Sequence, residues 1–164
     1  MKKAILISIK PEWVEEILNR SKITEIIRRD MPKCDLPIDV YIYCSKGNSY
    51  LYYFTDLLNG KVVAKFTLNK VSDISKNYKH ESIKNLYAWN IDNLQRFDKP
   101  MELSEFYKGN YEYIRDYVDC NNTNCPYAHD NSILGDDGHC DDYDCPYLKV
   151  NKPPRSWQYV YVGD

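Results

Sequence analysis

The same cysteine motif occurs twice between residues 120 and 147, and this repeat limits what that part of the chain can form. Each copy reads C-x4-C-P-Y. Cys120 and Cys125 make the first pair, Cys140 and Cys145 make the second, and 14 residues separate the pairs. Four thiolates in two such pairs can surround one Zn²⁺ tetrahedrally and leave no position for water. The repeat therefore predicts a closed structural zinc site.

The residues around these cysteines cannot form a hydrophobic core of their own. They are rich in aspartate and glycine: Asp130, Gly135, Asp136, Asp137, Gly138, Asp141, Asp142 and Asp144. Such a composition stays disordered unless a crosslink holds it together, and a bound zinc ion supplies one. Disulfides or an iron–sulfur cluster would use the same cysteines, a calcium site would use the carboxylates, and His129 and His139 are alternative zinc ligands.

The cellular compartment decides between a metal and disulfides for these cysteines. Basic residues at the N-terminus are followed by a short apolar run, residues 4–9, and then by polar residues. This run is too short for a signal peptide or a membrane span, so we expect a cytoplasmic protein. In that reducing compartment, clustered cysteines favour metal binding over disulfides.

Charge is distributed unevenly along the chain. The net charge is −2, but residues 1–115 hold 19 Lys and Arg against 15 Asp and Glu, whereas residues 116–164 hold 3 against 9. A mildly basic body can meet phosphate groups while an acidic segment faces elsewhere. A solvated surface without a partner explains the same charges, so charge alone does not identify a ligand.

Alternating apolar residues predict a small β-rich fold. We expect strands over residues 4–9, 23–29, 40–44, 60–68, 86–91 and 157–162, a helix from Pro11 to about residue 20, and short helices over 102–107 and 111–118. The strand 60–68 puts Lys65 on the face opposite Phe66. About six strands with few helices indicate an α+β arrangement around a small, mainly antiparallel β-barrel.

Polar residues that can carry chemistry gather after the first helix. Lys22, Thr24, Glu25 and Arg28 lie within seven residues of one another. A lysine beside a carboxylate can bind a phosphate or a polar base edge, or take part in proton transfer. Charged residues at a helix end are also commonly solvated, and that explanation stands beside the functional one.

A set of motifs along nearly the whole chain resembles the ASCH domain family of the PUA-like superfamily, and especially its phage and prophage members. The similar segments are Ile7-Ser8-Ile9-Lys10-Pro11, Lys22-x-x-Glu25 with Arg28, Pro32-Lys33, residues 40–47 and 60–66, Tyr87-Ala88-Trp89, Lys99-Pro100, and Pro153-Pro154-Arg155-Ser156-Trp157-Gln158-Tyr159-Val160. That subgroup often carries a cysteine-containing insertion before the Pro-Pro run. The resemblance implies a barrel formed by residues 1–118 and 148–164, a helix over its mouth, and an insertion at 119–147.

The resemblance also implies a cleft beside that helix that binds RNA or a nucleoside, but this chain departs from the family pattern. Arg20 stands where the pattern has glycine, and one extra residue separates Glu25 from Arg28. A shift of one residue turns a strand side chain to the other face, so only one of these two is expected to reach the cleft unless a bulge intervenes. Lys65 occupies the position of the carboxylate used by members resembling amidohydrolases, which speaks against catalysis.

Three functions follow from these residues. The leading hypothesis is a module that binds RNA or a modified nucleotide through Lys10, Lys22, Arg28 and Lys65. Trp13 could stack on a base, but its place in the apolar stripe of the helix favours core packing. The second is a nucleoside amidohydrolase or a ribonuclease with Lys22, Thr24 and Glu25 as candidate catalytic residues. The third is a phage protein that binds a host protein through its acidic, zinc-bearing segment.

Overall fold

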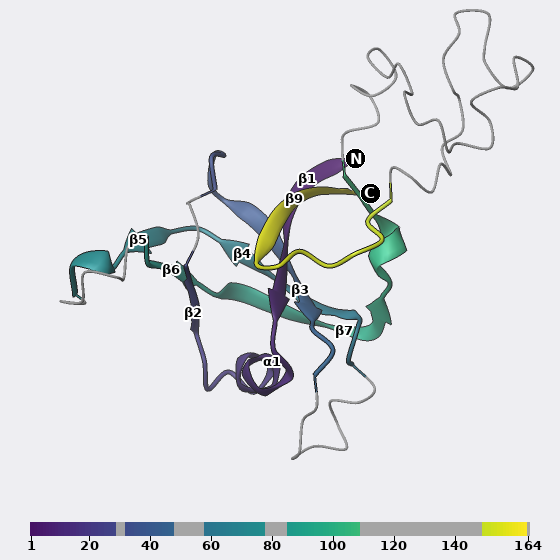
Figure 1. Ribbon diagram of the computed structural model, residues 1–164, viewed down its shortest axis with the longest axis horizontal. Coiled ribbons are helices and arrows are strands. Elements are labelled where there is room, and N and C mark those ends of the chain that lie inside the picture. Colours follow the sequence, from purple (N-terminus) through teal and green to yellow (C-terminus); the bar gives the residue numbers. More distant parts are fainter. Residues whose placement is uncertain (29–31, 48–57, 78–84, 109–148, 164) are drawn as a thin grey trace, which may run out of the picture.

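The computed structural model describes residues 1–28, 32–47, 58–77, 85–108 and 149–163, and these form two β-sheets and one α-helix (Figure 1). The larger sheet has the strand order β7-β4-β3-β1-β9-β8. Its strands are β1 (Lys2–Ile9), β3 (Ile38–Cys44), β4 (Val62–Leu68), β7 (Asp92–Met101), β8 (Phe106–Tyr107) and β9 (Trp157–Val162). The smaller sheet has the order β2-β6-β5, with β2 (Thr24–Ile27), β5 (Val71–Asp73) and β6 (Tyr87–Asn90). Two short 3₁₀ turns, Ser75–Asn77 and Leu103–Glu105, complete the described elements.

The larger sheet is mixed and open. β1 pairs with β3 in parallel and with β9 in antiparallel orientation, and the other pairings in this sheet are antiparallel. The prediction of a mainly antiparallel, β-rich α+β fold is confirmed, but the larger sheet does not close into the expected small barrel. β7 and β8 are the two edges of the larger sheet, and in the described part of the chain they do not pair with each other.

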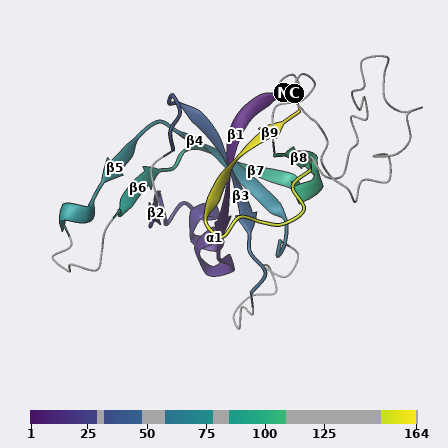
Figure 2. The same cartoon turned by 45° about the horizontal axis from the view of Figure 1, so that its top comes forward.

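Each face of the larger sheet covers a core cluster, because side chains alternate between the faces of a strand. On one face, the odd-numbered residues of β1, from Ile5 to Ile9, pack with Val40, Phe66 and Trp89 and with the buried side of the helix. On the opposite face, Leu6, Tyr41 and Phe106 belong to a second cluster. Figures 1 and 2 show the smaller sheet to one side of the larger one, with the helix near the end of β1.

Helix α1 (Pro11–Leu18) connects β1 to β2 and packs on the first core cluster. Pro11 occupies the first turn, where a missing N–H costs nothing, and Glu12 favours that end of the helix. Val14 and Ile17 are buried. Arg20 leaves the helix with φ of 59°, in the left-handed region. Glycine takes this conformation without steric cost, so a non-glycine residue here is held in a conformation that suits glycine better.

The expected elements match the observed ones unevenly. The strands expected over 4–9, 23–29, 40–44, 60–68, 86–91 and 157–162 are confirmed with small shifts of their ends. The helix expected over 102–107 is wrong, because only a 3₁₀ turn forms there and β8 follows it. The helix expected over 111–118 lies outside the described residues. β5 and β7 were not expected from the sequence.

No helix in the described ranges combines the length and apolar character that crossing a membrane requires.

Candidate functional site

Lys22 and Glu25 form an ion pair beside α1. Lys22 follows the end of the helix, where its N–H donates a hydrogen bond to the Glu16 carbonyl, and Glu25 is the second residue of β2. The Lys22 Nζ lies 3.4 Å from Glu25 Oε2, and the two side chains are 21% and 15% exposed. The structure therefore brings together two of the three catalytic candidates, in a place that is mostly shielded from solvent.

Glu25 rather than Arg28 faces the protein interior. β2 pairs with β6 in an unbroken register in which Glu25 lies opposite Trp89, so no bulge absorbs the extra residue. Glu25 shares its side of β2 with Ile27, which belongs to the first core cluster. Thr24 points to the other side of the strand by the same alternation, away from the Lys22–Glu25 pair. Arg28 follows the end of β2 and is exposed.

Burial makes the carboxylate of Glu25 unusually basic. Desolvation raises the pKa of Glu25, and the attraction of Lys22 opposes this rise without cancelling it. Glu25 Oε2 is buried, and among the described residues no group hydrogen-bonds to it with good geometry. The indole Nε1 of its neighbour Trp89 is likewise buried without a partner within the described ranges. Lys22 is therefore the charged partner of Glu25, and the buried Trp89 Nε1 is a donor that no group in the described ranges accepts from.

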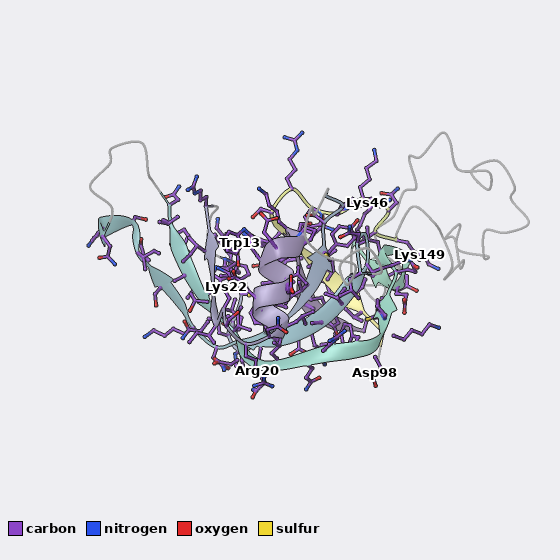
Figure 3. All side chains as sticks on the ribbon, turned by 90° about the horizontal axis from the view of Figure 1, so that it is seen from below. Trp13, Arg20, Lys22, Lys46, Asp98 and Lys149 are labelled. Carbon is purple, nitrogen blue, oxygen red and sulfur yellow. The ribbon has the colours of Figure 1, made fainter. Side chains whose placement is uncertain are left out.

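Trp13 lies on the surface next to Lys22. The Lys22 Nζ is 5.2 Å from the centre of the Trp13 ring, which is a cation–π contact. Figure 3 shows the two side chains next to each other at the side of α1. Trp13 is 43% exposed, so the expectation that it packs in the core is wrong. Its ring sits at the edge of the apolar stripe that Val14 and Ile17 form, and it can meet a ligand. We refer to Trp13, Lys22, Glu25 and Trp89 as the α1–β2 site.

Lys65 does not join this site. It lies opposite Tyr41 in the pairing of β3 with β4, on the face that carries the second core cluster. Its Nζ is 3.7 Å from Asp39 Oδ2, and Lys2 holds the same oxygen at 2.9 Å. We call Lys2, Asp39 and Lys65 the Asp39 cluster. The four cations expected to share one cleft are therefore divided between two faces, and Lys10, which precedes α1, is exposed.

An aromatic ladder extends from the α1–β2 site across the interior. Trp89 is fully buried, its ring centre is 5.9 Å from that of Trp157, and Trp157 is 5.4 Å from Tyr159. Burial, assisted by the Cys34 thiol, raises the pKa of Tyr159 to about 12. In the sequence, this ladder is indicated only by the odd-numbered aromatic residues of the last strand. Their partner Trp89 lies on a different sheet, so the spacing of residues could not identify it.

The predicted zinc ligands Cys120, Cys125, Cys140 and Cys145, the alternatives His129 and His139, and the acidic segment around them lie outside the described residues. Within the described ranges, no group of three or more His, Cys, Asp and Glu side chains is placed to hold a metal ion. Cys44 is fully buried, and burial raises the pKa of its thiol to about 11. Cys34 is half-buried.

Comparisons with known proteins agree with the fold. No protein-family model and no curated protein matches the sequence. Among solved structures, a serine-to-alanine variant of ZmASCH from Zymomonas mobilis is 14% identical, with 96% of this chain and 88% of that chain covered and a TM-score of 0.50. The ASCH protein of the same organism is 14% identical, with 96% of this chain and 87% of that chain covered and a TM-score of 0.49. A tyrosine-to-phenylalanine variant of ZmASCH is 18% identical, with 62% of this chain and 77% of that chain covered and a TM-score of 0.45. Identity this low speaks for the fold alone, and on the match with the TM-score of 0.50 the chain has the fold of an ASCH domain.

Proposed function

We propose that the protein binds a single-stranded RNA segment or a modified nucleotide at the α1–β2 site. The observation that carries this proposal is the exposed Trp13 ring with the Lys22 ammonium beside it. A base stacked on an exposed aromatic ring gains about 1–3 kcal/mol, and a nearby cation can meet the adjoining phosphate. Lys10, just before α1, and Arg28, just after β2, are exposed and add positive charge at the two ends of this segment.

The proposal assigns unequal roles to the four expected cations. Lys22 shares its charge with Glu25, so it attracts a phosphate less strongly than an unpaired lysine does. Lys65 faces away and is already near Asp39. We therefore expect Lys10, Lys22 and Arg28 to contribute to RNA binding and Lys65 to contribute little.

Fluorescence anisotropy with a short single-stranded RNA at several salt concentrations tests this proposal. Each phosphate contact steepens the salt dependence of the affinity by about 0.7 in a logarithmic plot. Lys22→Ala should weaken binding and flatten that dependence, and Trp13→Ala should weaken binding without changing the slope. Lys65→Ala is the matched control, because it removes the same charge from the other face. Absence of binding at low salt, or equal losses for Lys22→Ala and Lys65→Ala, would refute the proposal.

A second candidate is hydrolysis of an acylated nucleoside or of RNA, and the raised pKa of Glu25 favours it. A carboxylate whose pKa is raised by burial is a stronger general base, and it can take a proton from water. The neighbouring Lys22 ammonium can then stabilise negative charge that develops on the substrate. Thr24, the third candidate, faces the other side of β2 and has no place in this arrangement.

We also propose that Cys120, Cys125, Cys140 and Cys145 hold one structural Zn²⁺. The proposal rests on the doubled motif and on the acidic composition between its copies, which cannot form a core. Elemental analysis of reduced protein should find about one equivalent of zinc. Chelation should increase proteolysis within residues 120–147 and leave hydrogen exchange of β1 and β3 unchanged. Cysteines paired as disulfides in freshly reduced material, or clearly less than half an equivalent of zinc, would refute it.

A further inference from the structure

A pocket of about 660 Å³ lies between the start of β1 and the segment of residues 32–38, away from the α1–β2 site. Pro32, Pro37 and Ile38 give it apolar surface, and Lys3 and Lys33 supply two cations. Its volume falls in the range of pockets that bind small organic ligands. We call it the lysine pocket.

The charges of the lysine pocket favour an anion. Lys3 and Lys33 have no carboxylate within ion-pair distance in the described part of the chain, whereas Lys2, Lys22 and Lys65 each have one. Asp35 also lines the pocket, so the lining carries two positive charges and one negative charge. The Lys3 ammonium also lies over the Tyr159 ring, 4.3 Å from its centre.

The lysine pocket and the α1–β2 site open from the same side of the larger sheet. Lys3 and Tyr159 share the face of β1 and β9 that carries Ile5 and Ile7, and the aromatic ladder leads from Tyr159 through Trp157 and Trp89 to the strand position opposite Glu25. In Figure 1, α1 lies at one end of β2 and the segment before β3 lies beyond the other end. β2 itself spans about 13 Å with its four residues, and residues 28–31 follow it in the sequence before Pro32 of the lysine pocket.

We propose that the lysine pocket binds a second, phosphate-bearing nucleotide of the same RNA strand that contacts Trp13 and Lys22. Apolar surface can cover a base or ribose, and the two lysines can meet its phosphate. The inference rests on the proposed function and sharpens it: the ligand is an oligonucleotide that passes along β2, and an isolated nucleotide fills only part of the surface.

Lys33→Ala tests this inference, because Lys33 is exposed and its loss removes one charge without disturbing the core. The probes are a hexanucleotide of uridine, uridine 5′-monophosphate and inorganic phosphate. Lys33→Ala should weaken hexanucleotide binding about fivefold at 0.1 M salt and flatten its salt dependence by about 0.7, the loss of one phosphate contact. Binding of the mononucleotide should stay the same. Lys99→Ala is the matched control, since Lys99 is an exposed lysine on β7, at the far edge of the larger sheet.

The outcomes separate this inference from the proposed function. If Lys22→Ala weakens hexanucleotide binding and Lys33→Ala does not, the lysine pocket has no part in RNA binding and only the inference fails. If Lys33→Ala weakens mononucleotide or phosphate binding as much as hexanucleotide binding, the pocket takes a free anion and the inference fails as well. If the unmodified protein binds no RNA, both fail. Lys33→Gln, which keeps the length of a polar side chain, should repeat the result of Lys33→Ala.

Discussion

The Lys22–Glu25 pair and the Asp39 cluster use the same chemical groups on opposite faces of the fold, and they differ in the number of lysines that compensate the carboxylate and in how exposed those lysines are. Glu25 has one lysine partner at 3.4 Å, and both side chains are largely buried. Asp39 has two lysine partners, at 2.9 and 3.7 Å, and the Lys2 side chain is 65% exposed. The two carboxylates are almost equally exposed, Glu25 at 15% and Asp39 at 17%, so the difference lies in their partners: one largely buried lysine for Glu25, and two more exposed lysines for Asp39.

This difference appears in the pKa directions. For Glu25 the cost of burial exceeds the attraction of Lys22, so its pKa rises. In the Asp39 cluster, the hydrogen bond and the charge of Asp39 raise the pKa of Lys2, which means that the ion pair is the favoured state. A buried carboxylate with too few partners can exchange protons with a ligand, while a carboxylate shared by two lysines stabilises the fold. The comparison therefore makes Glu25, rather than Asp39, the candidate for proton transfer.

The largest expected effect separates the two carboxylates by catalysis. If the protein hydrolyses an acylated nucleoside such as N-acetylcytidine, or RNA, Glu25→Gln should lower kcat about 10²–10⁴-fold, because the general base is lost while the shape is kept. Asp39→Asn, the same change on the other face, should leave kcat unchanged. Product formation followed by chromatography provides the measurement. Equal activity of the two variants would remove Glu25 from the chemistry, and no activity in the unmodified protein would reject the second candidate function.

The second expected effect is a change of stability with opposite signs for the two carboxylates. Because the pKa of Glu25 is raised in the folded state, the folded protein holds this proton more tightly, and stability falls as the pH rises through the interval between the unfolded and folded values. At pH values above the folded-state pKa of Glu25, the full cost of burying its charged carboxylate remains. Glu25→Gln removes this cost and should stabilise the protein at neutral pH. Asp39→Asn should instead destabilise it by about 0.2–1 kcal/mol.

Urea unfolding at neutral pH and at a pH below the ordinary pKa of glutamate measures these changes. At the lower pH Glu25 is protonated in both states, so the advantage of Glu25→Gln should vanish. A Glu25→Gln variant that is less stable than the unmodified protein at neutral pH would show that Lys22 compensates Glu25 fully. The two carboxylates would then be equivalent, and the comparison would no longer identify a reactive site.

The sequence predicted the parts of this comparison that depend on alternation along one strand. The period of two in residues 60–68 put Lys65 opposite Phe66, and the structure confirms it. It could not predict that Glu25 lies beside Trp89, because that contact depends on the pairing of β2 with β6 across 60 residues of chain. The exposure of Trp13 was also missed, since a residue at the edge of a helix stripe has the same spacing as one at its centre.

β7 shows why an irregular edge strand escapes pattern analysis. Its half-buried apolar residues Leu94, Phe97 and Met101 are spaced by three and four positions, which is a helical period. Leu94 packs on the first core cluster and Phe97 and Met101 on the second, so the strand divides its few apolar residues between two faces, and its pairing with β4 shifts register twice. β7 is also an edge strand, so much of its length is polar and exposed. The sequence failed to predict the open sheet for the same reason, because one cannot judge whether a sheet closes when one of its edge strands has not been identified.

The smallest expected effect uses salt to separate the two carboxylates. At 1 M salt the screening length is about 3 Å, compared with about 10 Å at 0.1 M, and screening acts mainly through solvent. Lys2 is 65% exposed, so its attraction to Asp39 weakens with salt, and the penalty of Asp39→Asn should shrink by a few tenths of a kcal/mol. The gain from Glu25→Gln should persist or grow slightly, because salt does not remove the desolvation cost and can only weaken the compensating attraction of Lys22.

Urea unfolding of both variants at the two salt concentrations measures these changes in stability. A gain from Glu25→Gln that disappears at 1 M salt would mean that Glu25 is destabilised by like charges through solvent and not by burial, and the raised pKa would then have a different cause.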